Sequence, residues 1–168
     1  MNILAIGAHF DDIELGCSGT LINHVRKGDK VTMLVITDSS YINPTGEIIR
    51  ESEIAYQEGL KAANIIGAQL ICLNLKTFMV PFDEFLTKKI NYYIDDLKID
   101  TIYSHWVNDL HRDHQFTAKA VLMAGRHVPR FLMYRSNHYD TEQQFRGNFY
   151  SDISEAMDKK IEVIKVIR

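Results

Sequence analysis

The sequence predicts an α/β fold, a three-layer α/β/α sandwich around a mostly parallel sheet. Five short apolar runs alternate along the chain with segments that carry apolar residues at helical spacing. Strands that alternate with helices are typical of βαβ units, in which helices cover both faces of a parallel sheet. The chain has 168 residues and shows no internal repeat or linker, so we expect one domain over residues 1–168.

The predicted strands are nearly continuous apolar runs, as expected for strands that are buried on both faces. NILAIGA opens the chain, and KVTMLVIT, the second run, is rich in the β-branched residues that favour strands. We expect strands at 2–8, 30–37, 69–75, 100–104 and 130–135.

The predicted helices occupy the segments between these runs. Gly28 is expected to end the first helix, because glycine is the usual residue just beyond a helix C-terminus. Asn43, Pro44 and Gly46 are breakers of regular structure, so 39–46 is expected to be a loop. We expect helices at 15–28, 47–67, 82–98, 115–127 and 153–167.

Composition excludes several classes of protein. The net charge of -3 is unlike the basic surface of a nucleic-acid-binding protein. No apolar run reaches the ~20 residues that a membrane-spanning helix needs, and the first residues lack the basic segment of a signal peptide. Two cysteines do not make a disulfide framework, so a cytoplasmic location is expected.

Two clusters of polar residues follow predicted strands. His9, Asp11 and Asp12 come after the first strand, and His105, with the HRDH run at 111–114, comes after the fourth. In sheets of this kind, ligands bind beyond the carboxyl ends of the strands, where the strand order reverses. The two clusters are therefore expected to form one site.

The residue types in these clusters indicate a metal site. Two imidazoles and one carboxylate would leave the fourth position open, as in catalytic zinc sites. Nitrogen and oxygen ligands suit zinc but leave iron(II), cobalt and manganese open. Of two adjacent carboxylates, one would bind the metal while the other accepts a proton from an activated water. The alternatives are that Asp11 or Asp12 caps a helix and that the histidine pair lies on a helix surface.

The sequence also resembles a known family. AHFDDIELGCSGT, at 8–20, is similar to the first signature of the PIG-L/LmbE-like zinc-dependent de-N-acetylases, and DLHRDH, at 109–114, to the second. Shorter similarities, in order, extend the resemblance over nearly the whole chain. It implies a Rossmann-like form of the sandwich and an enzyme that removes an N-acetyl group from an amino sugar or sugar conjugate.

The resemblance also implies roles for individual residues. Asp11 would be the general base, and His111 would stabilise the tetrahedral oxyanion and protonate the leaving amine. Asp113 would orient His111, in the way that residues hydrogen-bonded to the imidazoles of a metal site orient those rings. Three residues would bind zinc, namely His9, Asp12 and His114.

The chain departs from the family pattern in several places, of which three matter for the argument. Phe10 and Arg112 stand where the signatures usually have proline. Members usually continue beyond the late helix, so a C-terminal tail of the family is expected to be missing after Arg168.

Four residues are expected to contact substrate. Arg50 would hold a hydroxyl or phosphate, although an ion pair with Glu53 on the helix surface explains it equally well. Trp106 would stack on a sugar ring, with ordinary packing as the alternative. Asn108 and Asp109 would hydrogen-bond the sugar, and Asp109 has a second possible role in orienting His111.

Two other functions compete with the deacetylase. A nucleotide- or sugar-binding transferase of Rossmann type is disfavoured, because the first strand is not followed by G-x-G-x-x-G. A non-catalytic sugar- or nucleotide-binding module would be expected to have lost Asp11 or His111, and both are present. Tyr92 and Tyr93 leave a homo-oligomer open.

Overall fold

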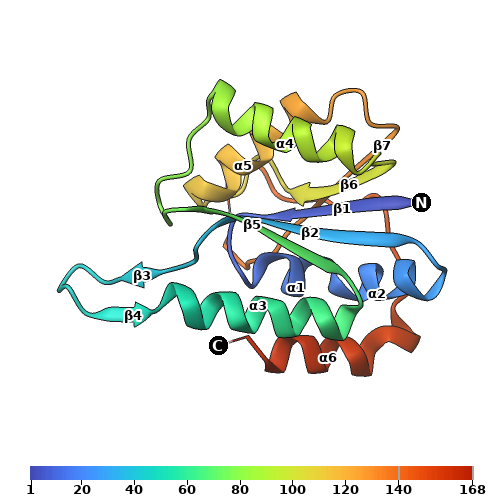
Figure 1. Cartoon of the computed structure of the whole chain (residues 1–168), viewed down its shortest axis with the longest axis horizontal. Coiled ribbons are helices and arrows are strands. Elements are labelled where there is room, and N and C mark those ends of the chain that lie inside the picture. The colour runs from blue at the N-terminus through green and yellow to red at the C-terminus, as the bar shows by residue number, and fades with distance from the viewer. Residues whose placement is uncertain (140, 168) are drawn as a thin grey trace.

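The computed structural model describes residues 1–139 and 141–167 and contains a five-stranded sheet between two layers of helices (Figure 1). The strand order is β5-β2-β1-β6-β7, and every neighbouring pair is parallel. The expected three-layer α/β fold is therefore confirmed. The strands are β1 (Asn2–Gly7), β2 (Lys30–Thr37), β5 (Gln69–Leu75), β6 (Thr101–His105) and β7 (Arg130–Tyr134).

Helices cover both faces of the sheet. On one face lie α1 (Asp12–Gly16), α2 (Ser18–Arg26), α3 (Ser52–Ile66) and α6 (Met157–Lys165), which follows the short 3-10 helix η1 (Ser154–Ala156). On the other face lie α4 (Glu84–Asp96) and α5 (Arg112–Ala124) (Figure 1). Among the described residues, no helix is both long enough and apolar enough to cross a membrane.

The central strand β1 shows why these apolar runs form a doubly covered sheet. Successive side chains of a strand point to opposite faces. Ile3 and Ala5 accordingly belong to the core under α2 and α3, whereas Leu4 and Ile6 belong to the core under α4 and α5. All four are completely buried. A continuous apolar run therefore supplies both cores.

The helix expected at 15–28 is in fact two helices with a break at Cys17. Gly16, the last residue of α1, lies directly against the ring of Tyr134, and a Cβ built at Gly16 would come within 2.1 Å of Tyr134 Cδ2. The helical spacing of apolar residues continues through Cys17, so the sequence does not show the break. The contact between Gly16 and Tyr134 of β7 shows why the helix is interrupted there. Gly28 has a φ of 82° and follows α2, as expected for a residue beyond a helix end.

The segment 39–46 is only partly a loop. Tyr41–Ile42 forms β3, which pairs in antiparallel fashion with β4 (Ile48–Arg50), and this hairpin projects beyond the N-terminal end of α3 (Figure 1). The expected helix at 47–67 consequently begins later, at Ser52. The breakers form the turn of this hairpin, where the Asn43 side chain accepts hydrogen bonds from the Thr45 and Glu47 amides. Strands of two and three residues are too short to show a period.

Phe10 is a core residue, which explains one departure from the family pattern. Its side chain is fully buried, and its amide donates a 2.8 Å hydrogen bond to Ser39 Oγ, which proline could not make. Gly59 of α3 provides the space, because a Cβ built there would lie 2.2 Å from Phe10 Cδ1. Phe10 and Gly59 thus fit together as a pair.

This fit predicts that Gly59→Ala destabilises the protein. Alanine in a helix is normally favoured over glycine by about 1 kcal/mol, but the overpacking here should outweigh that gain and lower the free energy of unfolding by about 1–3 kcal/mol. Urea denaturation measures the change. Adding Phe10→Leu should reduce the penalty of Gly59→Ala, and an unchanged penalty in the double variant would refute the pairing.

Candidate metal centre and active site

The candidate site lies where the strand order reverses, between the carboxyl ends of β1 and β6. His9 follows β1, His105 is the last residue of β6, and His111 is the N-cap of α5. Helix α5 therefore begins three residues before the expected position, which places His114 in its first turn. The two polar clusters, about a hundred residues apart in sequence, meet at this edge of the sheet, where β1 and β6 lie side by side (Figure 1).

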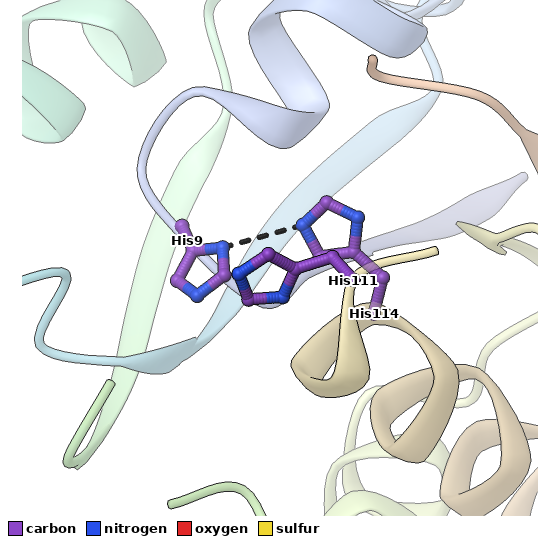
Figure 2. Close-up of side chains that lie close together, drawn as sticks. All are labelled: His9, His111 and His114. Atoms are coloured by element: carbon purple, nitrogen blue, oxygen red, sulfur yellow. Dashed lines mark hydrogen bonds between the residues drawn. The ribbon is translucent and has the colours of Figure 1, made fainter. Parts of the chain in front are cut away.

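Three of these side chains converge closely. His9 Nδ1 lies 3.3 Å from His114 Nε2 and 3.5 Å from Asp12 Oδ2, and His114 Nε2 lies 3.1 Å from Asp12 Oδ1. Zinc–ligand bonds of 2.0–2.1 Å in a tetrahedron separate the ligand atoms by roughly 3.3 Å. The separations fit such an ion. Figure 2 shows His9, His111 and His114 turned toward one another, with the contact from His9 to His114 dashed.

The far nitrogens of the two histidines face carboxylates. Asp113 Oδ2 lies 3.1 Å from His9 Nε2, and Asp109 Oδ1 lies 3.3 Å from His114 Nδ1. A carboxylate that holds the proton of one ring nitrogen leaves the lone pair of the other available to a metal. Asp113 and Asp109 thus fix the tautomers that would present His9 Nδ1 and His114 Nε2 to the centre of the cluster.

Charge in the cluster also favours a cation. Burial lowers the pKa of His9 and of His114, but the surrounding carboxylates outweigh it and raise these pKa values to about 9 and about 10. The pKa of Asp12 lies well below its usual range, despite burial, because of His105 and His114. The site formed by His9, Asp12 and His114 therefore stabilises positive charge. A divalent ion would supply that charge in place of the protons on the two imidazoles.

His105 is a further member of the cluster. Its fully buried Nε2 accepts a 3.0 Å hydrogen bond from the Ala8 amide and lies 3.1 Å from Asp12 Oδ2. Its ring stacks on that of His114, with ring centroids 4.0 Å apart. Among the residues that the structure describes, three groups could each hold an ion, their ligand atoms lying within 4.8 Å of one another: His9, His111 and His114; Asp12, His105 and His114; and His9, Asp11 and Asp12.

His111 is held in a form that donates one hydrogen bond. Its Nδ1 accepts a 3.2 Å hydrogen bond from the Asp113 amide, as the cap of α5, so the proton of the neutral ring is on Nε2. Burial, together with the nearby His114 and His9, lowers the pKa of His111 to about 4. The carboxylate of Asp113 faces His9 and not His111, so Asp113 acts on His111 through its backbone amide.

Asp11 has the environment of a base. Its Oδ1 is buried and has no hydrogen-bond partner among the described residues, and burial together with the neighbouring Asp12 raises its pKa. Its Cα lies at the start of α1, but its side chain makes no capping hydrogen bond there. Glu14, one turn further on, is fully buried, and burial raises its pKa to about 8. Sequence reasoning missed Glu14, although a charged residue inside an apolar turn was a visible signal.

A cavity of about 600 Å³ opens onto the cluster, and Arg50 lines it. The ion pair expected with Glu53 is wrong, because the Arg50 guanidinium donates instead to Glu58 Oε2 at 2.9 Å and to the carbonyl of Phe10 at 3.0 Å. Because α3 begins at Ser52, Arg50 lies outside the helix, at the end of β4. From there its side chain reaches Glu58 in the second turn of α3.

The other predicted substrate residues do not line this cavity. Trp106 packs edge-on against Phe145 and lines a second cavity. Asn108 donates to Gln143 at 2.5 Å. Both oxygens of Asp109 accept from Asn137, and Asp109 is only 2% exposed. Asp109 therefore orients His114, while sugar contacts by these residues stay predictions. Ser136, which donates to Asp12 at 2.9 Å, and Asn137 carried no signal in the sequence.

Comparison with known proteins places the chain among deacetylases. The family model of the GlcNAc-PI de-N-acetylases, PIG-L, matches residues 4–124. A protein of Escherichia coli (strain K12) named as the uncharacterized deacetylase YaiS is 32% identical over 144 residues, which are 80% of this chain and 73% of that protein.

Solved structures share the fold. The N,N'-diacetylchitobiose deacetylase of Pyrococcus horikoshii has a TM-score of 0.81 and 17% identity, with 98% of this chain and 68% of that one covered. GalB, the 4-carboxy-2-hydroxymuconate hydratase of Pseudomonas putida KT2440, also has a TM-score of 0.81, with 16% identity over 98% of this chain and 78% of that one. Two different reactions thus occur on this fold, and fold alone does not choose between them.

Proposed function

Because this chain belongs to the PIG-L family of GlcNAc-PI de-N-acetylases, we propose that it is a metal-dependent hydrolase that removes the N-acetyl group of an amino sugar or sugar conjugate. The observation that carries the proposal is the convergence of His9, Asp12 and His114, with a carboxylate behind each histidine. The proposed ion is Zn²⁺, and the nitrogen and oxygen ligands also suit Fe²⁺ or Co²⁺.

The reaction is hydrolysis of an amide. A bound zinc ion would supply Lewis-acid chemistry, which polarises the amide carbonyl and strengthens water as a nucleophile. Asp11 is the proposed general base. Its buried oxygen without a hydrogen-bond partner and its raised pKa suit a group that takes a proton from the attacking water. A carbon–oxygen bond forms to that water, and the negative charge that develops moves to the carbonyl oxygen.

His111 is the proposed stabiliser of that oxyanion. Its Nδ1 is occupied by the Asp113 amide, and its lowered pKa keeps the ring neutral, so its Nε2–H is the group available to donate. A neutral imidazole is a poor source of a proton for the leaving amine. We therefore assign that step to Asp11, which returns the proton taken from water as the carbon–nitrogen bond breaks. The products are acetate and the free amine.

Acetate release tests the proposed function. Zinc-loaded protein is incubated with a panel of N-acetylglucosamine, its methyl glycoside, a nucleotide-sugar conjugate and a chitin-like disaccharide, and acetate is measured by a coupled assay. We expect acetate and free amine in equal amounts from at least one compound. An unsaturated tricarboxylic acid is tested separately. No acetate from any compound of the panel at zinc saturation, with hydration of that tricarboxylic acid instead, would favour the chemistry of the hydratase on the same fold.

A further inference from the structure

The cavity beside the metal cluster has two unlike kinds of lining. His9, Asp11 and His111 carry the proposed chemistry. Apolar side chains line the cavity as well, and they are those of Tyr41, Ile48 and Ile49 of the β3–β4 hairpin, Ile54 in the first turn of α3, and Phe78 after β5. The volume of about 600 Å³ lies within the usual range for small-molecule sites. An apolar wall thus adjoins the groups that would act on the amide.

Phe78 is fixed in this wall by its backbone. Its amide donates a 2.7 Å hydrogen bond to Asp113 Oδ2, and its carbonyl accepts from Arg112. Its φ of 65° lies in the left-handed region, which large side chains rarely adopt. The surrounding structure therefore holds the backbone of Phe78 in a conformation that is rare for a large residue, and this fixes where its side chain begins.

The position of the Phe78 ring links the reactive groups to the hairpin. The ring stacks on His111, with centroids 5.6 Å apart and planes 27° apart, and it meets the ring of Tyr41 edge-on at 5.7 Å. Phe78 remains 42% exposed and Ile48 60% exposed. An aromatic and aliphatic surface thus begins beside His111 and continues onto β4.

Charge in the same cavity argues against an acidic substrate group. Apart from the histidines, the charged side chains among the described lining residues are Arg50, Asp11, Glu51 and Glu58. Arg50 is the one permanent cation among them, and it is already paired with Glu58. A phosphate or carboxylate placed beyond the metal cluster would meet more negative than positive charge.

We propose that the substrate carries an uncharged alkyl or aryl group next to its acylated amine and that Phe78, Tyr41, Ile48 and Ile49 bind this group. The inference rests on the proposed function and specifies its substrate class. The group has two possible positions, as the aglycone of the sugar or as a longer N-acyl chain, and both would bring the same apolar surface to this wall.

Calorimetric binding to the zinc-loaded full chain separates the two positions. One series comprises methyl, butyl and hexyl glycosides of N-acetylglucosamine, and the other comprises methyl glycosides with N-acetyl, N-butanoyl and N-hexanoyl groups. A buried methylene strengthens binding by up to roughly fourfold, so we expect the dissociation constant to fall by at least about tenfold along one series. That series identifies the position. Equal dissociation constants along both series would overturn the inference.

Three variants localise the effect. Phe78→Asn removes the ring and suits the left-handed backbone, and Ile48→Asn removes the aliphatic wall; each should flatten the dependence on chain length. Ile42→Asn is the matched control, because Ile42 pairs with Ile48, is equally exposed at 60%, and does not line the cavity. An equal loss of chain-length dependence with Ile42→Asn would show that the cavity wall does not bind the group and would overturn the inference. A loss of self-association in the Phe78 and Ile48 variants, with no change in chain-length dependence, would assign the surface to a second copy of the chain.

Acetate release from the methyl glycoside of N-acetylglucosamine, measured in parallel, keeps the two proposals apart. Acetate release with no chain-length dependence in binding would retain the deacetylase function and reject the apolar wall. Binding that tightens with chain length without any acetate release would reject the deacetylase function and retain the wall.

Discussion

Asp11→Ala will keep its metal and lose turnover by about 10²–10⁴-fold, the usual contribution of a general base. Asp11 has a buried oxygen without a partner among the described residues and a raised pKa, whereas the neighbouring Asp12 is engaged by His105, His114 and Ser136. Removing Asp11 should therefore remove the proton acceptor and leave the ligands in place. The measurements are kcat for acetate release and zinc content per chain.

Two comparisons make this prediction discriminating. Glu53→Ala removes an exposed carboxylate on α3 and should leave kcat unchanged within a factor of two or so. If Asp11→Ala instead empties the metal site, Asp11 is a ligand, as one of the three possible ligand groups would allow. The division of roles between Asp11 and Asp12 would then be wrong.

Removing the metal will reduce acetate release to background. Dipicolinate should strip the ion, because it is held by three side chains at most in the proposed set, and one equivalent of zinc should restore activity. Asp12→Ala should resist restoration, since Asp12 is the carboxylate of the proposed ligand set and lies within 3.5 Å of His9 and His114. Zinc content by elemental analysis and kcat follow the cycle.

A positional control accompanies the chelation test. Asp29 also contacts a histidine, His24, at 2.7 Å, but lies away from the cluster, so Asp29→Ala should remain restorable by zinc. Activity that survives exhaustive chelation would eliminate the metal-dependent reaction, whatever the behaviour of the Asp12 variant.

The sequence by itself determined the framework and the identity of the central cluster. Short continuous apolar runs such as 2–8, bounded by turns and alternating with helical segments, indicate strands covered on both faces, and parallel strands place their carboxyl ends at one edge. His9 and Asp12 therefore had to meet residues that follow another strand. The two signatures around Asp11 and His114 made that meeting specific, and the structure brings them to within hydrogen-bonding distance.

Only the tertiary structure decided the features that depend on contacts between distant segments. The break at Cys17 follows from Gly16 meeting Tyr134, and the partner of Arg50 is Glu58 because a hairpin replaces the first turn of the expected helix. Periodicity reports how a segment meets the core, but not which side chains approach across the molecule.

The same reason separates the parts of the active site. The residue types predicted a metal cluster, because whether a side chain can bind a metal depends on its own nitrogen or oxygen atoms. The packing of α5 against the segments around it sets the orientation of the side chains. Asp113 faces His9, Asp109 lies beside His114, and the ring of Phe78 stacks on that of His111. The sequence thus determined which atoms could do the chemistry, and the tertiary structure decided how they are oriented, because orientation depends on neighbours that are remote along the chain.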